Sequence, residues 1–146
     1  MISGSVEYLV TYLIKMTITI KNRGDIKSAE EIIRQGYPAI AGRFGYILES
    51  SADLHWPVAR VLLPFLVSIG DILVPEIKAV LNAENLDHKY LCITNIISSM
   101  NPKFAEVFRS ELERIADSPT NEEREEELQV DAQAAMEELG WRDCEE

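Results

Sequence analysis

The apolar stretch over residues 55–81 constrains the fold of this chain more than any other feature. Trp56 and Pro57 predict the start of a helix, because proline at the first helical position has a suitable φ and needs no N–H partner. Apolar residues follow at the spacing of one helix face as far as Gly70, which we expect to end the helix in the left-handed conformation. A second helix is predicted to begin near Pro75. The stretch therefore predicts a helical hairpin.

The same arrangement recurs on both sides of this hairpin. Pro38 and Pro102 are placed as Pro75 is, at the start of the second helix of a predicted pair. The repeating unit is about thirty residues long, and a hairpin of this size buries its apolar face only against its neighbours. We therefore predict an all-α fold, a short α-solenoid of about three helical hairpins, with an ordinary helical bundle as the alternative.

Local signals predict where several helices begin and which residues they bury. Asp25 and Ser28 are alternative caps for the first helix of the first pair, because Ser28 is followed by Glu31 as in a capping box. The second helix of that pair is predicted to run from Pro38 as one piece. In the third pair, the second helix is predicted to bury Phe104, Val107, Phe108, Leu112 and Ile115.

A last helix is predicted over about residues 120–139, starting at Thr120 and stopping at Gly140, where it would cap the solenoid. Its apolar face consists of Leu128, Ala132, Ala135, Met136 and Leu139. The predicted organisation is an N-terminal helix or extension over residues 1–24, one helical-repeat domain over residues 25–140, and an acidic tail over residues 141–146.

The charge of −11 is concentrated at the C-terminal end of the chain. Residues 1–110 contain 11 acidic and 11 basic side chains, whereas residues 111–146 contain 14 acidic and 3 basic ones. Nucleic acids and anionic membranes attract clustered Lys and Arg, so neither is expected as a partner. A protein partner is expected instead, and a basic protein would suit a predicted acidic face made of Glu122, Glu123 and Glu126.

Enzyme activity and cofactor binding are not expected. The chain has no GxSxG, GxGxxG or HExxH motif. His88 and Cys92 are four residues apart on a predicted helix, but two ligands are too few for a structural zinc site. Cys92 lies in an apolar helical pattern and Cys144 lies far from it, which favours reduced cysteines and a cytoplasmic location.

One group of side chains is a candidate binding site, because two predicted helices begin with aromatic and basic residues. If these helix starts lie on one face, the group forms a recognition patch of the kind that Trp, Tyr and Arg often anchor. In the alternative, Trp56 is simply buried in the core and the histidines are solvated. The candidate residues are His55, Trp56, Arg60, His88, Lys89 and Tyr90.

Four segments carry a resemblance to a known family: RQGYPAI (34–40), WPVARVLLPFLVSIGDILVPEIKAVL (56–81), HKYLCITNIISSM (88–100) and ERIADSPTNEEREEE (113–127). They are similar to the bacterial family known as domain of unknown function 5071, over about residues 25–140. Residues 1–24 depart from the family pattern, and His88 stands where a tryptophan is expected. The family is similar to HEAT-like helical repeats and has no established activity, so the resemblance implies a HEAT-like α-solenoid and leaves the function open.

Two functions are compatible with these observations. The first is a non-catalytic protein–protein interaction module, either an adaptor or an immunity-type protein that neutralises a toxin, because solenoids present extended binding surfaces. The second is a small ligand-binding domain or an enzyme that uses His55, Trp56 and His88.

Overall fold

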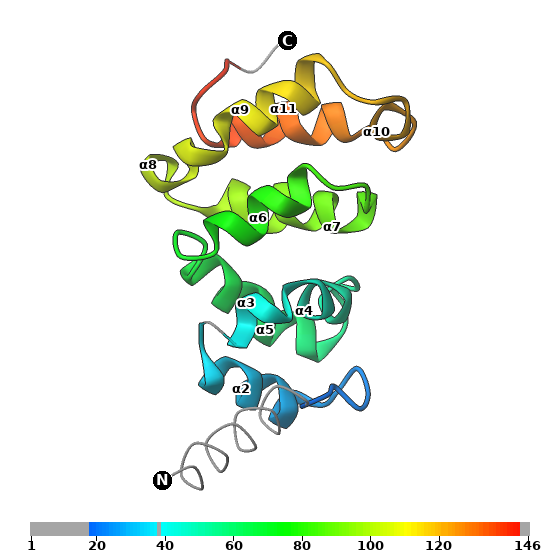
Figure 1. Ribbon diagram of the computed structural model, residues 1–146, viewed down its shortest axis with the longest axis vertical. Helices are drawn as coiled ribbons and strands as arrows, with labels where there is room; N and C mark the ends of the chain where they lie inside the picture. The colour runs from blue at the N-terminus through cyan, green and yellow to red at the C-terminus, as the bar shows by residue number, and fades with distance from the viewer. Residues whose placement is uncertain (1–17, 38, 144–146) are drawn as a thin grey trace, which may run out of the picture. The chain divides into compact units, whose positions relative to one another are not determined.

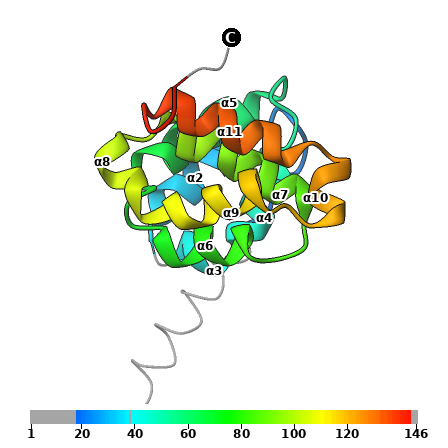
Figure 2. The same ribbon diagram turned by 90° about the horizontal axis from the view of Figure 1, so that it is seen from above.

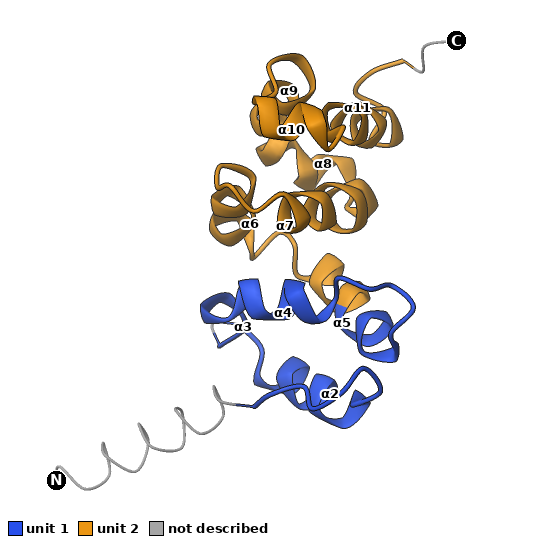
Figure 3. Ribbon diagram, turned by 90° about the vertical axis from the view of Figure 1, so that its right-hand side faces the viewer, with its two compact units in different colours: residues 1–62 blue, residues 63–146 orange. Residues whose placement is uncertain are grey.

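The computed structural model describes residues 18–37 and 39–143, and every regular element among them is a helix (Figure 1). The prediction of an all-α fold is confirmed. Of the N-terminal helix or extension predicted over residues 1–24, residues 1–17 lie outside the described residues, as do Pro38 and Cys144, and residues 18–24 form no helix. The chain divides into two compact units, residues 1–62 and 63–146, which are coloured separately in Figure 3. The single domain predicted over residues 25–140 stays a prediction.

Capping chemistry explains the first helices of unit 1. A carboxylate oxygen of Asp25 accepts a hydrogen bond from the backbone N–H of Ser28 at 3.2 Å, so Asp25 is the cap of α2. Gly36, with a φ of 67°, ends this helix as predicted. The helices here are α2 (Ile26–Gln35), α3 (Ala39–Gly42), α4 (Phe44–Ser50) and the start of α5 (Pro57–Ser68), within which the boundary between the units falls.

The second helix of the first pair is not the single piece that was predicted. It ends at Gly42 and restarts at Phe44, with Arg43 in a turn between them. Glycine has a low helix propensity, so interrupting the helix after Gly42 costs little free energy. Both pieces still contribute to the core through Ile40, Phe44, Ile47 and Leu48.

The helices of unit 2 pack against one another. The helix α11 lies along α9, as Figures 1 and 2 both show, and also contacts the irregular continuation of α7. That continuation is a π-helix (Cys92–Ile96) followed by a 3₁₀ turn (Ile97–Ser99). The α-helices are α6 (Val74–Leu81), α7 (Leu86–Leu91), α8 (Pro102–Ala105), α9 (Arg109–Asp117), α10 (Asn121–Glu125) and α11 (Leu128–Glu138).

Gly70 plays a different role from the one predicted. The left-handed glycines among the described residues are Gly36 and Gly140, so Gly70 does not end α5 in that conformation. It is buried instead, and a Cβ atom added to it would lie 3.0 Å from Sδ of Met100. Any larger residue here would require the side chain of Met100 to shift, and the local sequence does not reveal this close approach from a distant part of the chain.

The prediction that Phe104 and Val107 are buried is wrong, since they are 50% and 46% exposed. A 3₁₀ turn (Glu106–Phe108) separates α8 from α9. Because a 3₁₀ turn has three residues rather than 3.6, Ala105 takes the place above Phe108 that Phe104 would have in a continuous α-helix. The buried stripe is Ala105, Phe108, Leu112 and Ile115.

The last predicted helix is two helices, separated at Glu126 and Glu127. Glu127 has a φ of 58°, in the left-handed region, which stops α10 and lets α11 begin in a new direction. Gly140 ends α11 with a φ of 77°. The five predicted apolar residues of this segment, from Leu128 to Leu139, are all buried.

Among the described residues, no helix has both the length and the apolar character that crossing a membrane requires.

The break between α10 and α11 can be tested at Glu127. A side chain in the left-handed region costs about 1 kcal/mol, a cost that glycine avoids. Glu127→Gly is therefore expected to leave the free energy of unfolding unchanged or to raise it by up to about 1 kcal/mol. Glu126→Gly removes the same charge at a φ of −90° and is expected to lower it by about 0.5–1 kcal/mol. Urea denaturation of both variants measures the difference, and equal destabilisation would contradict the strained conformation.

Candidate functional site

A buried ion-pair network joins three helices of unit 2 at Glu123. This residue has no exposed surface. Its Oε2 accepts hydrogen bonds from Nζ of Lys89 and from Nη2 of Arg114, each at 2.7 Å, and its Oε1 accepts one from Nη1 of Arg114 at 3.0 Å. Lys89 belongs to α7, Arg114 to α9 and Glu123 to α10. One carboxylate therefore connects elements that are up to 34 residues apart in sequence.

The same carboxylate also caps its own helix. The hydroxyl oxygen of Thr120 accepts from the backbone N–H of Glu123 at 3.1 Å, and the backbone N–H of Thr120 donates to Oε1 of Glu123 at 2.9 Å. This is a complete capping box, which confirms the helix start predicted at Thr120. The box turns the carboxylate of Glu123 back toward the helix start, where Arg114 and Lys89 reach it.

These contacts hold Glu123 in its ionised form. Burial alone would raise the pKa of this carboxyl, because it penalises the charged form. The hydrogen bonds from Arg114, Lys89 and the Thr120 N–H outweigh burial and lower the pKa from 4.5 to about 2. The carboxylate of Glu123 is thus ionised throughout the neutral range.

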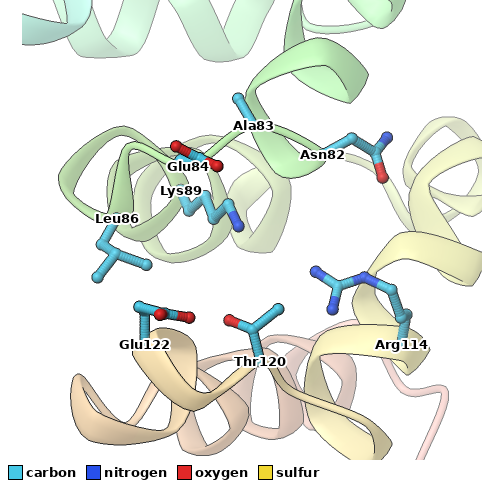
Figure 4. Close-up of a pocket in the computed structure, with 8 residues that line it drawn as sticks. All are labelled: Asn82, Ala83, Glu84, Leu86, Lys89, Arg114, Thr120 and Glu122. Carbon is cyan, nitrogen blue, oxygen red and sulfur yellow. The ribbon is translucent and has the colours of Figure 1, made fainter.

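A pocket of about 500 Å³ opens beside this network. In Figure 4 the ammonium group of Lys89 and the guanidinium group of Arg114 point toward its centre from opposite sides, and the hydroxyl group of Thr120 lies below them. The pocket therefore combines a cationic interior with a partly apolar wall, an arrangement suited to a small polar ligand. Its lining consists of Asn82, Ala83, Glu84, Leu86, Lys89, Arg114, Thr120 and Glu122.

The candidate recognition patch is divided between the two units. His55 and Arg60 are exposed and Trp56 is partly exposed, all in residues 1–62. His88 and Tyr90 are partly exposed and exposed, respectively, in residues 63–146. The meeting of these side chains on one face stays a prediction. Lys89 is not available to an exposed patch, because its side chain is 5% exposed and bound to Glu123.

The acidic face also needs a correction. Glu122 and Glu126 are exposed as predicted, whereas Glu123 is fully buried. A run of carboxylates usually indicates a solvated helix face, and for this reason the sequence predicts Glu123 on an exposed face. Two sequence signals were available: the Thr-x-x-Glu spacing, and the position of Lys89 three and four residues before the apolar Cys92 and Ile93, on the same helix face.

Cys92 lies in the core, as its apolar pattern predicted. Burial raises the pKa of its thiol to about 12, so the thiol stays protonated and unreactive at neutral pH. Within residues 18–37 and 39–143, no three His, Cys, Asp or Glu side chains come together in a way that could hold a metal ion.

The network predicts unequal effects for two adjacent carboxylates. Glu123→Gln leaves the two cations without an anionic partner and is expected to lower the free energy of unfolding by about 3–5 kcal/mol. Glu122→Gln removes an exposed carboxylate and is expected to change it by less than about 0.5 kcal/mol. Urea denaturation at neutral pH measures both values. A loss below about 1 kcal/mol in Glu123→Gln would show that the network contributes little.

The lowered pKa of Glu123 predicts a loss of stability in acid. An unfolded chain takes up the proton near the ordinary value of 4.5, whereas the folded protein does so only near 2. The contribution of this group is therefore complete above pH 4.5 and declines as the pH falls toward 2. The difference in unfolding free energy between wild type and Glu123→Gln should shrink over this range. A difference that stays constant would contradict the shift.

Comparison with known proteins identifies the family of this chain. The model of the family described as "Domain of unknown function (DUF5071)" matches residues 18–136, which confirms the resemblance carried by the four segments. Searches of curated proteins and of solved structures found no significant match. Because the match includes most of the chain, the protein belongs to the DUF5071 family.

Proposed function

We propose that this protein is a non-catalytic protein-binding module and that its acidic end, at α10, binds a basic partner. The observation that carries the proposal is the anchoring of α10 by Glu123. A five-residue helix is too short to be stable by itself. The network fixes it to α7 and α9, so the carboxylates around Glu123 are presented from a rigid support.

The exposed carboxylates of this segment form one continuous group along the chain. We call Glu122, Glu125, Glu126 and Glu127 the α10 surface; all four are exposed. Arg124 is the only basic residue between them. Concentrated charge of one sign speeds encounter with an oppositely charged protein and disfavours partners of like charge.

A HEAT-like α-solenoid is the architecture we propose for this role. In residues 63–146, α6 packs against the next helix α7, and α9 packs against α11 across the short helix α10, which supports a repeat of helical pairs. Such folds present long surfaces to other proteins, as an adaptor or an immunity-type protein requires. The cytoplasmic location predicted from the cysteines stays part of this proposal.

A ligand-binding or enzymatic role for His55, Trp56 and His88 is the alternative. The side chain of His55 is exposed and that of Trp56 is partly exposed, so both are accessible in unit 1. The binding role at α10 is the better supported one, because the contacts of Glu123 fix the helix that would present it.

The α10 surface can be tested by charge reversal. Glu122→Lys/Glu125→Lys/Glu126→Lys is compared with Glu30→Lys/Asp71→Lys/Glu138→Lys, which makes the same change in net charge at exposed residues elsewhere. Glu123 is left unchanged, because its reversal would disrupt the buried network. Partners captured by the wild type are identified and purified, and their affinity for each variant is then measured.

We expect a basic partner to lose about tenfold or more in affinity with the α10 variant, and to bind the control variant nearly as well as the wild type. Rising salt should weaken the wild-type complex, since exposed charges are screened. A purified partner that binds the α10 variant as tightly as the wild type would refute this role for the α10 surface.

A further inference from the structure

Lys89 has hydrogen-bonding capacity that the protein itself does not use. Its ammonium group carries three donors. Among the described residues it has one acceptor, Oε2 of Glu123, although its side chain is only 5% exposed. Buried donors normally find acceptors in the protein or in bound molecules. Because Lys89 lines the pocket beside the network, its unused donors are available to an occupant of that pocket.

The charges of the network are also unequal. Lys89 and Arg114 both bind the same oxygen of Glu123 at 2.7 Å, so two cations share one carboxylate. Glu84 and Glu122 line the pocket but form no ion pair with either cation in the described structure. The three charges of the network therefore sum to one positive charge. The side chain of Arg114 is 36% exposed and that of Lys89 only 5%, so water screens the charge of Lys89 least, and a negative group inside the pocket would stabilise it.

Arg114 can contribute to binding such a group. Its guanidinium has five donors, and the structure uses Nη1 and Nη2 for Glu123 and, at 3.4 Å, for the carbonyl of Ser118. Guanidinium and ammonium groups together match the two oxygens of a carboxylate. Lys89 and Arg114 together therefore favour a ligand group with a single negative charge, such as a carboxylate.

Two exposed carboxylates also line the pocket. Glu84 and Glu122 lie on the side of Lys89 that is away from Arg114, as Figure 4 shows. Leu86 and Ala83 add apolar surface to the lining. A dianion would be repelled by these carboxylates and a simple cation by Lys89 and Arg114. A molecule with a carboxylate and an ammonium group satisfies both.

We propose that this pocket binds a small zwitterion, an amino acid or a short peptide. The carboxylate of the ligand binds Lys89 and Arg114, and its ammonium group lies near Glu84 and Glu122. The volume of about 500 Å³ lies in the range of small-ligand pockets and accommodates a molecule of this class. Glu122 belongs to both this pocket and the α10 surface, whereas Glu84, Lys89 and Arg114 belong to the pocket and not to that surface.

The ligand class is tested with the full chain and a defined panel. The twenty common amino acids and L-alanyl-L-alanine are added at up to about 10 mM, well above the millimolar dissociation constants typical of weak ligands. Backbone amide chemical shifts are followed by NMR. We expect at least one compound to shift the amides of residues 82–89 and 120–122 in a saturable manner. No saturable shift in these residues with any compound would overturn the proposal.

Blocked forms of the best compound test the two charges. Amidation of its carboxyl group removes the anion for Lys89 and Arg114, and acetylation of its amino group removes the cation for Glu84 and Glu122. Each change is expected to weaken binding about tenfold or more, because each removes a charge complement. Equal binding of either blocked form would overturn the zwitterionic assignment.

A matched pair of substitutions locates the ligand. Ala83→Trp fills the pocket from an exposed loop position and leaves the ion-pair network intact. Ala79→Trp places the same side chain at an exposed position of α6 outside the lining. We expect about a tenfold or greater loss of affinity in Ala83→Trp and none in Ala79→Trp. Unchanged affinity in Ala83→Trp, with its fold confirmed by NMR, would place the ligand elsewhere and refute the site.

Discussion

The ionised carboxylate of Glu123, held without solvent exposure, is the constraint on which the second half of this structure depends. Such a group is tolerated in a protein interior only when cations and hydrogen-bond donors surround it. Lys89, Arg114 and the backbone N–H of Thr120 meet that requirement together. The positions of α7, α9 and α10 are therefore coupled through one side chain, and the pocket between them exists because these helices must converge on it.

Local chemistry made many features of the fold predictable. Asp25 and Thr120 cap helices through bonds to nearby backbone groups, and Gly36 and Gly140 end helices by adopting a positive φ. Each of these depends on residues within four positions, which the sequence places together by covalent connection alone. Helical spacing likewise identified the buried face of α11, because a regular helix converts sequence intervals directly into faces.

The features that escaped prediction depend on distant contacts or irregular turns. Gly70 is buried with Met100 packed closely against it, and nothing near Gly70 in sequence indicates that neighbour. Phe104 is exposed because the 3₁₀ turn between α8 and α9 changes which residues lie on the buried face. The partner of Lys89 lies 34 residues away. The candidate pocket was missed for the same reason, since charge along the chain does not reveal which charges meet inside.

A carboxylate shared by two cations also restricts how the sequence can change over time. Losing Glu123 leaves both cations without an anion, whereas losing one cation leaves the other paired with Glu123, so the effects of separate losses overlap and their energies do not add. Replacing all three by apolar side chains of similar volume can cost far less than replacing one. Glu123 is therefore the member of this network that is hardest to replace alone, and its replacement is tolerated best when Lys89 and Arg114 change with it.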